Sequence, residues 1–387
     1  MPRAFPLLLL LLGSCGTAAA QQSVGWVERS GSVGWVERSE PHHLSSAALV
    51  AVLPQEESRR SDPAARRDVE QAAAKLVTPA ADRAIQRGLK WLTAVQHDDG
   101  SFATGPLRGN AAICALAGMA YLSSGSTPGR GPYGAQVERC TRYILANVQP
   151  SGFISAGDTG HGPMYGHGFG TMYLAECDGM APRLDIREKL AKAVKLIVNC
   201  QNKDGGWRYQ PVVVEVADIS VTVCQLVALR AARNAGLFVP NEVVDRAVGY
   251  LKRSQNPDGG FMYMLQGGGR ESAFPRSAAA VAALYSAGIY RGPEIDKGLA
   301  YVMQFLPTEG AAPRASYYFY GHYYAAQAMW QAGGQRWLRW YPAIRDDLIA
   351  RQRDDGSWTS PETNECATAM ALLALEMPNN YLPIFQR

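Results

Sequence analysis

The sequence predicts an all-α protein built from six helical hairpins, on the strength of three observations. A glutamine-containing motif recurs along residues 79–387 at steps of 53, 52, 54, 49 and 48 residues. Each repeat pairs an amphipathic segment of helical spacing with a segment that is apolar nearly all round. The composition, 47% hydrophobic and 19% charged, excludes a wholly disordered chain and allows a large core.

The chain begins with a pattern typical of secretory leaders. Arg3 precedes the apolar run Ala4–Leu12, which is too short to span a membrane, and small residues lead up to Ala20. We therefore expect a signal peptide over residues 1–20 and export to the periplasm or cell envelope. Because Leu-Gly-Ser-Cys15 also resembles a lipoprotein cleavage site, a lipid anchor at Cys15 is the one membrane attachment that the sequence predicts.

Residues 21–78 are predicted to be a disordered linker. They contain a nine-residue tandem duplication, Ser-Val-Gly-Trp-Val-Glu-Arg-Ser, which starts at Ser23 and again at Ser32. The rest of the segment is polar, mixed in charge and without apolar periodicity, so it cannot bury enough surface to fold.

The repeat motif places a glutamine six residues before an aromatic residue, with Asp-Gly between them. A glycine after a helix end adopts a left-handed conformation readily, and aspartate favours the turn through its own side chain. We expect the glutamine amide to bond backbone groups at the end of the next outer helix, so the motif's role is structural. The full copies begin at Gln96, Gln201, Gln255 and Gln352, a contracted copy at Gln149 and an eroded one at Gln304.

Periodicity favours helices over the strands of a propeller blade. Before one motif, apolar residues Ile186, Leu190, Val194 and Ile197 lie on one helical face. The segments that follow the motifs lack a polar face and must be buried on every side. We expect an outer layer of amphipathic helices around an inner layer of apolar ones, the latter including residues 111–122, 221–232, 277–287 and 367–375.

The cysteines are predicted to be small buried hydrophobes, although a disulfide framework stays open for an exported protein. They are scattered through apolar segments, and no CxxC pair occurs. Beyond Cys15, they are Cys114, Cys140, Cys177, Cys200, Cys224 and Cys366.

These motifs, two helices per unit and six units, resemble the prenyltransferase and squalene-cyclase superfamily, and in particular bacterial exported proteins with prenyltransferase and squalene oxidase repeats. The resemblance covers residues 79–387. It implies an α/α toroid, in which the hairpins close into a barrel with inner helices around a hydrophobic cavity. Closure of the ring rests on the resemblance, because periodicity alone predicts only stacked hairpins.

The catalytic motifs of that superfamily are not intact in this chain. Its cyclases use an Asp-x-Asp-Asp segment at the start of an inner helix, where this sequence offers only Asp218. A lone aspartate at a helix N-terminus is expected to cap the helix as an anion, which opposes a role as a proton donor. The zinc-binding Asp-x-Cys of the protein prenyltransferases is replaced by Asp218-Ile219-Ser220, so we expect no metal or other cofactor.

Polar residues before or at the start of the inner helices would converge at one mouth of a closed ring. They could bind a ligand there, and paired carboxylates could cleave a glycan, but each acid could equally cap its own helix. Besides Asp218, the candidates are Asp158, His161, His167, Glu271, Arg276, Tyr317, Tyr320, His322 and Glu365.

The sequence therefore predicts an exported ligand-binding or scaffold toroid without the standard catalytic motifs. Its ligand would be a hydrophobic, isoprenoid-like molecule or a glycan. A net charge of only +4, from 38 basic and 34 acidic residues, argues against nucleic acid as a partner. Two enzymes stay open as alternatives: a terpenoid cyclase with a rearranged acid, and a carbohydrate-active enzyme that uses carboxylates at the mouth.

Overall fold

The computed structural model describes residues 76–156, 162–308 and 316–386 of the chain. The predicted signal peptide and nearly all of the predicted linker lie outside these residues. The described residues form α-helices, two short 3₁₀ helices and isolated β-bridges, with no strand among them. None of their helices is long and apolar enough to cross a membrane.

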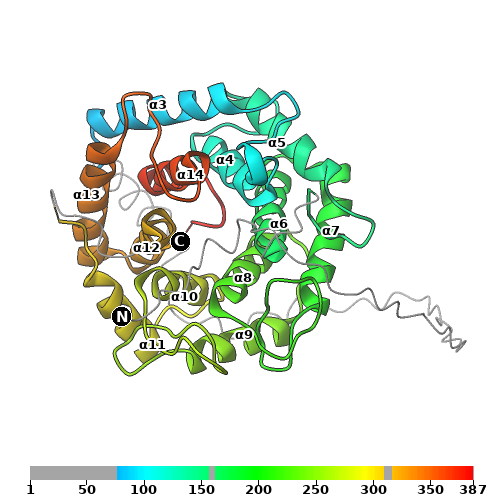
Figure 1. Ribbon diagram of the computed structural model, residues 1–387, viewed down its shortest axis with the longest axis vertical. Coiled ribbons are helices and arrows are strands. Elements are labelled where there is room, and N and C mark those ends of the chain that lie inside the picture. Colours follow the sequence, from blue (N-terminus) through cyan, green and yellow to red (C-terminus); the bar gives the residue numbers. More distant parts are fainter. Residues whose placement is uncertain (1–75, 157–161, 309–315, 387) are drawn as a thin grey trace, which may run out of the picture. The chain divides into compact units, whose positions relative to one another are not determined.

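Helices of the described residues alternate between an outer and an inner ring (Figure 1). The outer ring contains α3 (Pro79–Val95), α5 (Gly134–Ala146), α7 (Leu184–Asn199), α9 (Asn241–Arg253), α11 (Pro293–Met303) and α13 (Gly334–Arg351). The inner ring contains α4 (Ala111–Ser123), α6 (Pro163–Met180), α8 (Ile219–Asn234), α10 (Phe274–Ser286), α12 (Tyr318–Ala332) and α14 (Asn364–Leu375). The 3₁₀ helices are η2 (Gly105–Leu107) and η3 (Met377–Asn379).

The ring is closed. Each inner helix contacts the next one along the chain, and the last, α14, returns to contact the first, α4. The outer helix α13 likewise contacts α3. The predicted all-α toroid of six hairpins is therefore confirmed.

The distribution of apolar residues explains the two layers. Every residue of α4 is buried, whereas α9 buries only Val243, Val244, Ala247, Tyr250 and Leu251. A helix with one apolar stripe turns the rest of its surface to water, while a helix that is apolar all round is stable only when protein surrounds it.

The repeat motif joins each hairpin to the next. The Gln201 amide donates to the carbonyl of Gly205 in its own loop (2.9 Å) and to that of Val243 in α9 (2.8 Å). Gln255 makes the same pair of bonds, to Gly259 and to Glu294 in α11. The predicted tie to the next outer helix is therefore confirmed.

The motif glycine permits a close approach between backbones. Gly205 has φ +94°, and a Cβ placed there would lie 2.1 Å from the carbonyl oxygen of Arg246 in α9. No amino acid other than glycine can adopt this conformation and also allow so close a contact. The equivalent glycines 100, 152, 259 and 356 also have positive φ and lie as close to the next outer helix.

The C-terminal segment covers the end of the ring at which the inner helices finish. The backbone N–H of Ile384 donates to Glu176 near the end of α6 (3.2 Å), and the indole of Trp330 near the end of α12 donates to the carbonyl of Phe385 (3.0 Å). Asn379 donates to the last residue of α4 and Asn234, the last residue of α8, donates to Pro383. No pattern in the sequence predicts this C-terminal seal.

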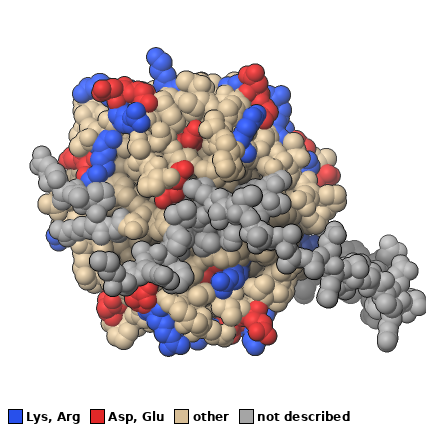
Figure 2. Space-filling model, in the orientation of Figure 1, with Lys and Arg blue, Asp and Glu red and all other residues tan. Residues whose placement is uncertain are grey.

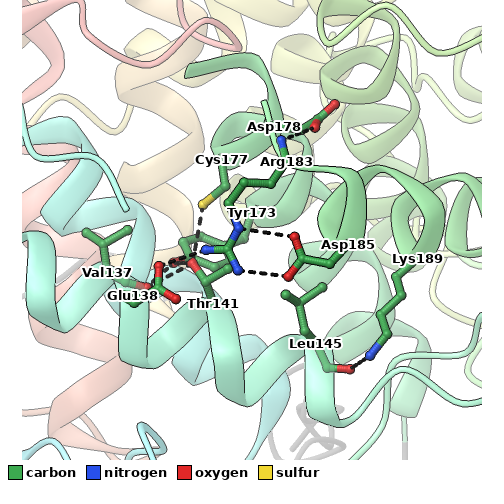
Figure 3. Close-up of polar contacts among 10 residues, drawn as sticks. All are labelled: Val137, Glu138, Thr141, Leu145, Tyr173, Cys177, Asp178, Arg183, Asp185 and Lys189. Carbon is green, nitrogen blue, oxygen red and sulfur yellow. Dashed lines mark hydrogen bonds and ion pairs between the residues drawn. The ribbon is translucent and has the colours of Figure 1, made fainter. Parts of the chain in front are cut away.

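Polar contacts fasten neighbouring hairpins at the rim. Arg183 binds both Glu138 of α5 and Asp185 of α7, and Lys189 donates to the carbonyl of Leu145, as Figure 3 shows. Such partly exposed ion pairs are worth only ~0–1 kcal/mol each, so they orient the hairpins more than they stabilise them. Acidic and basic side chains are interspersed around the periphery of the face in Figure 2.

The six cysteines of the described residues are buried and unpaired. This agrees with their interpretation as small hydrophobes on helices rather than as a disulfide framework.

Candidate functional site

Asp218 caps the inner helix α8. Its Oδ1 accepts hydrogen bonds from the backbone N–H groups of Ser220 and Val221, both at 3.0 Å. The side chain is fully buried, and Oδ2 has no hydrogen-bond partner among the described residues. Capping therefore uses only one of the two carboxyl oxygens.

Burial raises the pKa of Asp218 to about 7, although the two backbone bonds and the nearby Arg208 lower it. The position at a helix N-terminus predicts an ionised carboxyl, and the two capping bonds do lower the pKa. The loss of solvation outweighs them, so a large fraction of the carboxyl holds its proton at neutral pH. A protonated Oδ2 becomes a hydrogen-bond donor.

Five tyrosines of the described residues interact electrostatically with this carboxyl. One is the buried Tyr250 of α9, whose hydroxyl donates to the carbonyl of Ala217 (2.9 Å). Tyr165, in the first turn of α6, and Tyr320, in the first turn of α12, are buried and interact electrostatically with Asp218. Because α10 separates α8 from α12 in the ring, the interaction of Tyr320 with Asp218 joins two inner helices that are not consecutive. Tyr209 and Tyr263 belong to the loops before α8 and α10, are half-buried, and also interact with Asp218.

The cluster combines aromatic rings with a few hydroxyl groups and one carboxyl. Burial raises the pKa of Tyr209 to about 12 and raises that of Tyr165 as well, so both phenols stay protonated. The guanidinium of Arg208 lies 5.3 Å from the centre of the Tyr209 ring. Aromatic faces with a few convergent donors are suited to an apolar molecule that carries an acceptor.

The two predicted histidines that the structure describes are packed away from this cluster. His167 accepts the N–H of Ile154 through Nδ1 (3.1 Å) and packs against Phe153. His322 packs between Phe274 and Trp340. Burial lowers the pKa of each histidine to about 3, so both are neutral.

The other predicted residues make local contacts. The Glu271 side chain is 76% exposed, and Arg276 donates to the carbonyls of Phe261 and of Glu271. Glu365 accepts from Thr363, which itself caps α14. The half-buried Tyr317 directly precedes α12, while Asp158 and His161 lie outside the described residues.

Of the predicted residues that the structure describes, only Tyr320 interacts with Asp218. Neither Glu271 nor Glu365 forms a carboxylate pair with it. The described part of the chain also contains no group of three or more histidine, cysteine and acidic side chains that could hold a metal ion.

The prenyltransferase α/α toroid domain family matches residues 72–192 and 174–318, which together are more than half of the chain. The chain belongs to this family. No curated protein matches this prenyltransferase-family toroid.

Solved structures share its fold at low sequence identity. A type II terpene cyclase from Scytonema, in complex with geranylgeranyl dihydroxybenzoate, is 15% identical, with a TM-score of 0.55 over 78% of this chain and 98% of that chain. An α-1,6-mannanase from Salegentibacter, in complex with α-1,6-mannotriose, is 8% identical, with a TM-score of 0.59 over 78% and 99%. A protein from Actinoplanes is 17% identical, with a TM-score of 0.54 over 77% and 99%. The fold thus hosts different chemistries.

Sequence reasoning missed Tyr165, Tyr209 and Tyr263. A signal for two of them was present, because Tyr209 follows the motif aromatic Trp207 by two residues and Tyr263 follows Phe261 by two. In this toroid the tyrosines at the equivalent position of two consecutive repeats lie close enough for their hydroxyl groups to form a hydrogen bond.

Proposed function

We propose that the chain binds an apolar, isoprenoid-class small molecule at the end of the ring where the inner helices begin. The observation that carries this proposal is the fully buried Oδ2 of Asp218, which has no partner and lies among tyrosines. A buried polar atom without a partner costs ~1–3 kcal/mol. A ligand that accepts a hydrogen bond from Asp218 recovers that free energy, and the aromatic rings contact its apolar part.

An isoprenoid fits this site better than a glycan. Cleavage of a glycosidic bond requires two carboxyl groups ~5–9.5 Å apart, and the predicted acids do not supply a second one beside Asp218. The solved structures bind either class, and their identity to this chain is too low to choose between them.

Native mass spectrometry of protein purified from its own envelope fraction tests this function. We expect a co-purifying isoprenoid on the wild type and its loss from Asp218→Ala. The matched control is Glu271→Gln, which changes an exposed carboxyl at the same end of the ring. A bound glycan, or undiminished isoprenoid on Asp218→Ala, contradicts the proposal.

The raised pKa of Asp218 favours one second candidate, an isoprenoid cyclase. With a pKa of about 7, a large fraction of Asp218 is protonated at neutral pH, and the surrounding aromatic faces would stabilise a carbocation. In that case incubation with a linear isoprenoid gives a cyclic isomer of unchanged mass, and Asp218→Asn gives none. If the isoprenoid binds but no cyclic product forms, the cyclase candidate is rejected and only the binding function remains.

We also propose that the chain is exported, on the basis of its leader. N-terminal sequencing of the mature protein should find residue 21 first. If Cys15 carries lipid, Cys15→Ser releases the protein from the membrane fraction.

A further inference from the structure

Two of the tyrosines that interact with Asp218 also contact each other. Tyr209 lies on the loop between α7 and α8, and Tyr263 lies on the loop between α9 and α10. Their hydroxyl groups form a hydrogen bond that links the two loops. Both side chains are half-buried, whereas Asp218, Tyr165 and Tyr320 are buried. The linked pair is thus more exposed to solvent than the carboxyl with which both tyrosines interact.

Two further polar contacts link the same loops, since Arg208 donates to the sulfur of Met264 (3.2 Å) and Gln266 donates to Asp204 (3.1 Å). The carbonyl of Tyr209 accepts from the N–H of Met164 at the start of α6 (3.1 Å), and that of Tyr263 accepts from the N–H of Ile219 at the start of α8 (2.9 Å). Around these anchors the loops are exposed, with Val213 60% accessible on one loop. On the other, a Cβ added to Gly268 would meet no atom within 4 Å.

We infer that the Tyr209–Tyr263 hydrogen bond is the gate through which an apolar molecule reaches Asp218. Opening breaks this bond together with the Arg208–Met264 and Gln266–Asp204 contacts. It moves loop segments with exposed side chains, which open at a lower free-energy cost than the packed helices. A ligand that accepts hydrogen bonds replaces the broken one with bonds to the two freed phenols. This inference rests on the proposed function, because it concerns access to the same carboxyl.

Dicyclohexylcarbodiimide is a suitable probe, since it is apolar and reacts with protonated carboxyl groups. The Asp218 proton moves to a carbodiimide nitrogen while the carboxyl oxygen bonds to the central carbon. An O-to-N acyl shift then leaves a stable N-acylurea on Asp218. Peptide mapping by mass spectrometry gives the labelling rate at Asp218 and, in the same sample, at the buried carboxyl Glu176 at the opposite end of the ring.

We expect Tyr209→Phe and Tyr263→Phe each to raise the labelling rate at Asp218 about three- to tenfold, the effect of one lost hydrogen bond on an opening equilibrium. The double variant should be no faster than either single variant, because all three lack the same bond. The matched control is Tyr143→Phe, which loses a 2.7 Å hydrogen bond to the carbonyl of Gly109 away from the gate. The rate at Glu176 should stay unchanged in every variant.

Different outcomes of this experiment reject the gate and reject the proposed binding function on which the gate rests. An Asp218 rate that neither single variant changes, or a double variant whose acceleration is the product of the two single ones, overturns the gate. An equal acceleration at Glu176 overturns it too, because it shows general loosening of the fold. If Asp218 reacts in none of the proteins while Glu176 does, no apolar molecule reaches this carboxyl, and the proposed binding function is itself wrong.

Discussion

The side chain of Gln352 and the backbone of Ala84, 268 residues apart in the chain, are joined by a 2.8 Å hydrogen bond. Gln352 also donates to Gly356 in its own loop. These are the same two bonds that the glutamines of earlier repeats make to the unit that follows them. At the seam, which is the junction between the last hairpin and the first, the following unit is the first one. The motif that joins consecutive hairpins therefore also closes the ring.

The seam should therefore be as strong as an ordinary junction. We expect Gln352→Ala to lower the free energy of unfolding by about 1–3 kcal/mol, because it removes two hydrogen bonds. Gln255→Ala, which breaks the same two bonds between consecutive units, should cost the same within about 0.5 kcal/mol. Urea unfolding measures both, with the exposed Gln335→Ala as the control. A seam variant as stable as this control would show that the ring does not depend on the bond.

A pair of glycines tests the backbone contact in the repeat. Gly205→Ala should destabilise the fold by several kcal/mol, since its Cβ would lie 2.1 Å from the Arg246 oxygen at a strained φ of +94°. Gly179→Ala, on the exposed side of α6 with no atom within 4 Å of the new Cβ, should instead stabilise the protein by about 0.5–1 kcal/mol. Thermal unfolding of the two variants tests this prediction. Equal melting temperatures would contradict the close backbone contact at Gly205.

The stability of the wild type should depend on pH through Asp218. Its pKa is about 7 in the folded chain and near the usual 3.8 in the unfolded chain, so the folded state holds its proton more tightly. The stability from this group is fully present below pH ~4 and is lost as the pH rises towards 7, at up to ~1.4 kcal/mol per pH unit.

Asp218→Asn isolates this effect, because the amide oxygen can still cap α8 but the side chain does not titrate. Relative to the wild type, the variant should gain stability between pH 5 and pH 8. Urea unfolding at both values gives the difference, in which the other titrating groups cancel. A constant difference would show that the native carboxyl is ionised throughout.

The C-terminal seal should contribute substantially to stability. Deleting the chain from Pro383 onward removes the buried side chains of Ile384 and Phe385, each worth ~1.5–3 kcal/mol. It also leaves Glu176 without its backbone donor. We expect a clear fall in melting temperature, compared with no more than a slight one for the exposed Gln386→Ala. A truncated chain as stable as the full one would show that the segment merely rests on the ring.

The fold could be predicted from the sequence because its signals are local and repeated. The apolar spacing of Ile186, Leu190 and Val194 sets an outer helix, and the lack of polar residues along 111–122 sets an inner one. Ring closure needed the family resemblance, because no single repeat specifies how far the next one is rotated.

The site was harder to predict, because it depends on residues that are distant in sequence. Asp218 was found from its position at a helix start, but its protonation depends on burial by Tyr165 and Tyr320, which no local pattern reveals. His322 and Tyr320 are two residues apart on one helix and point to different surroundings. Sequence proximity therefore could not tell which of them faces the centre.

Because the last hairpin contacts the first, the closed ring does not require any particular one of the six units to come first in the sequence. A circular permutant that joins residue 386 to residue 76 with a flexible linker, and opens the chain in a solvent-exposed connection elsewhere, retains every contact between neighbouring units. It should therefore assemble the same toroid, with a different hairpin emerging first from the ribosome.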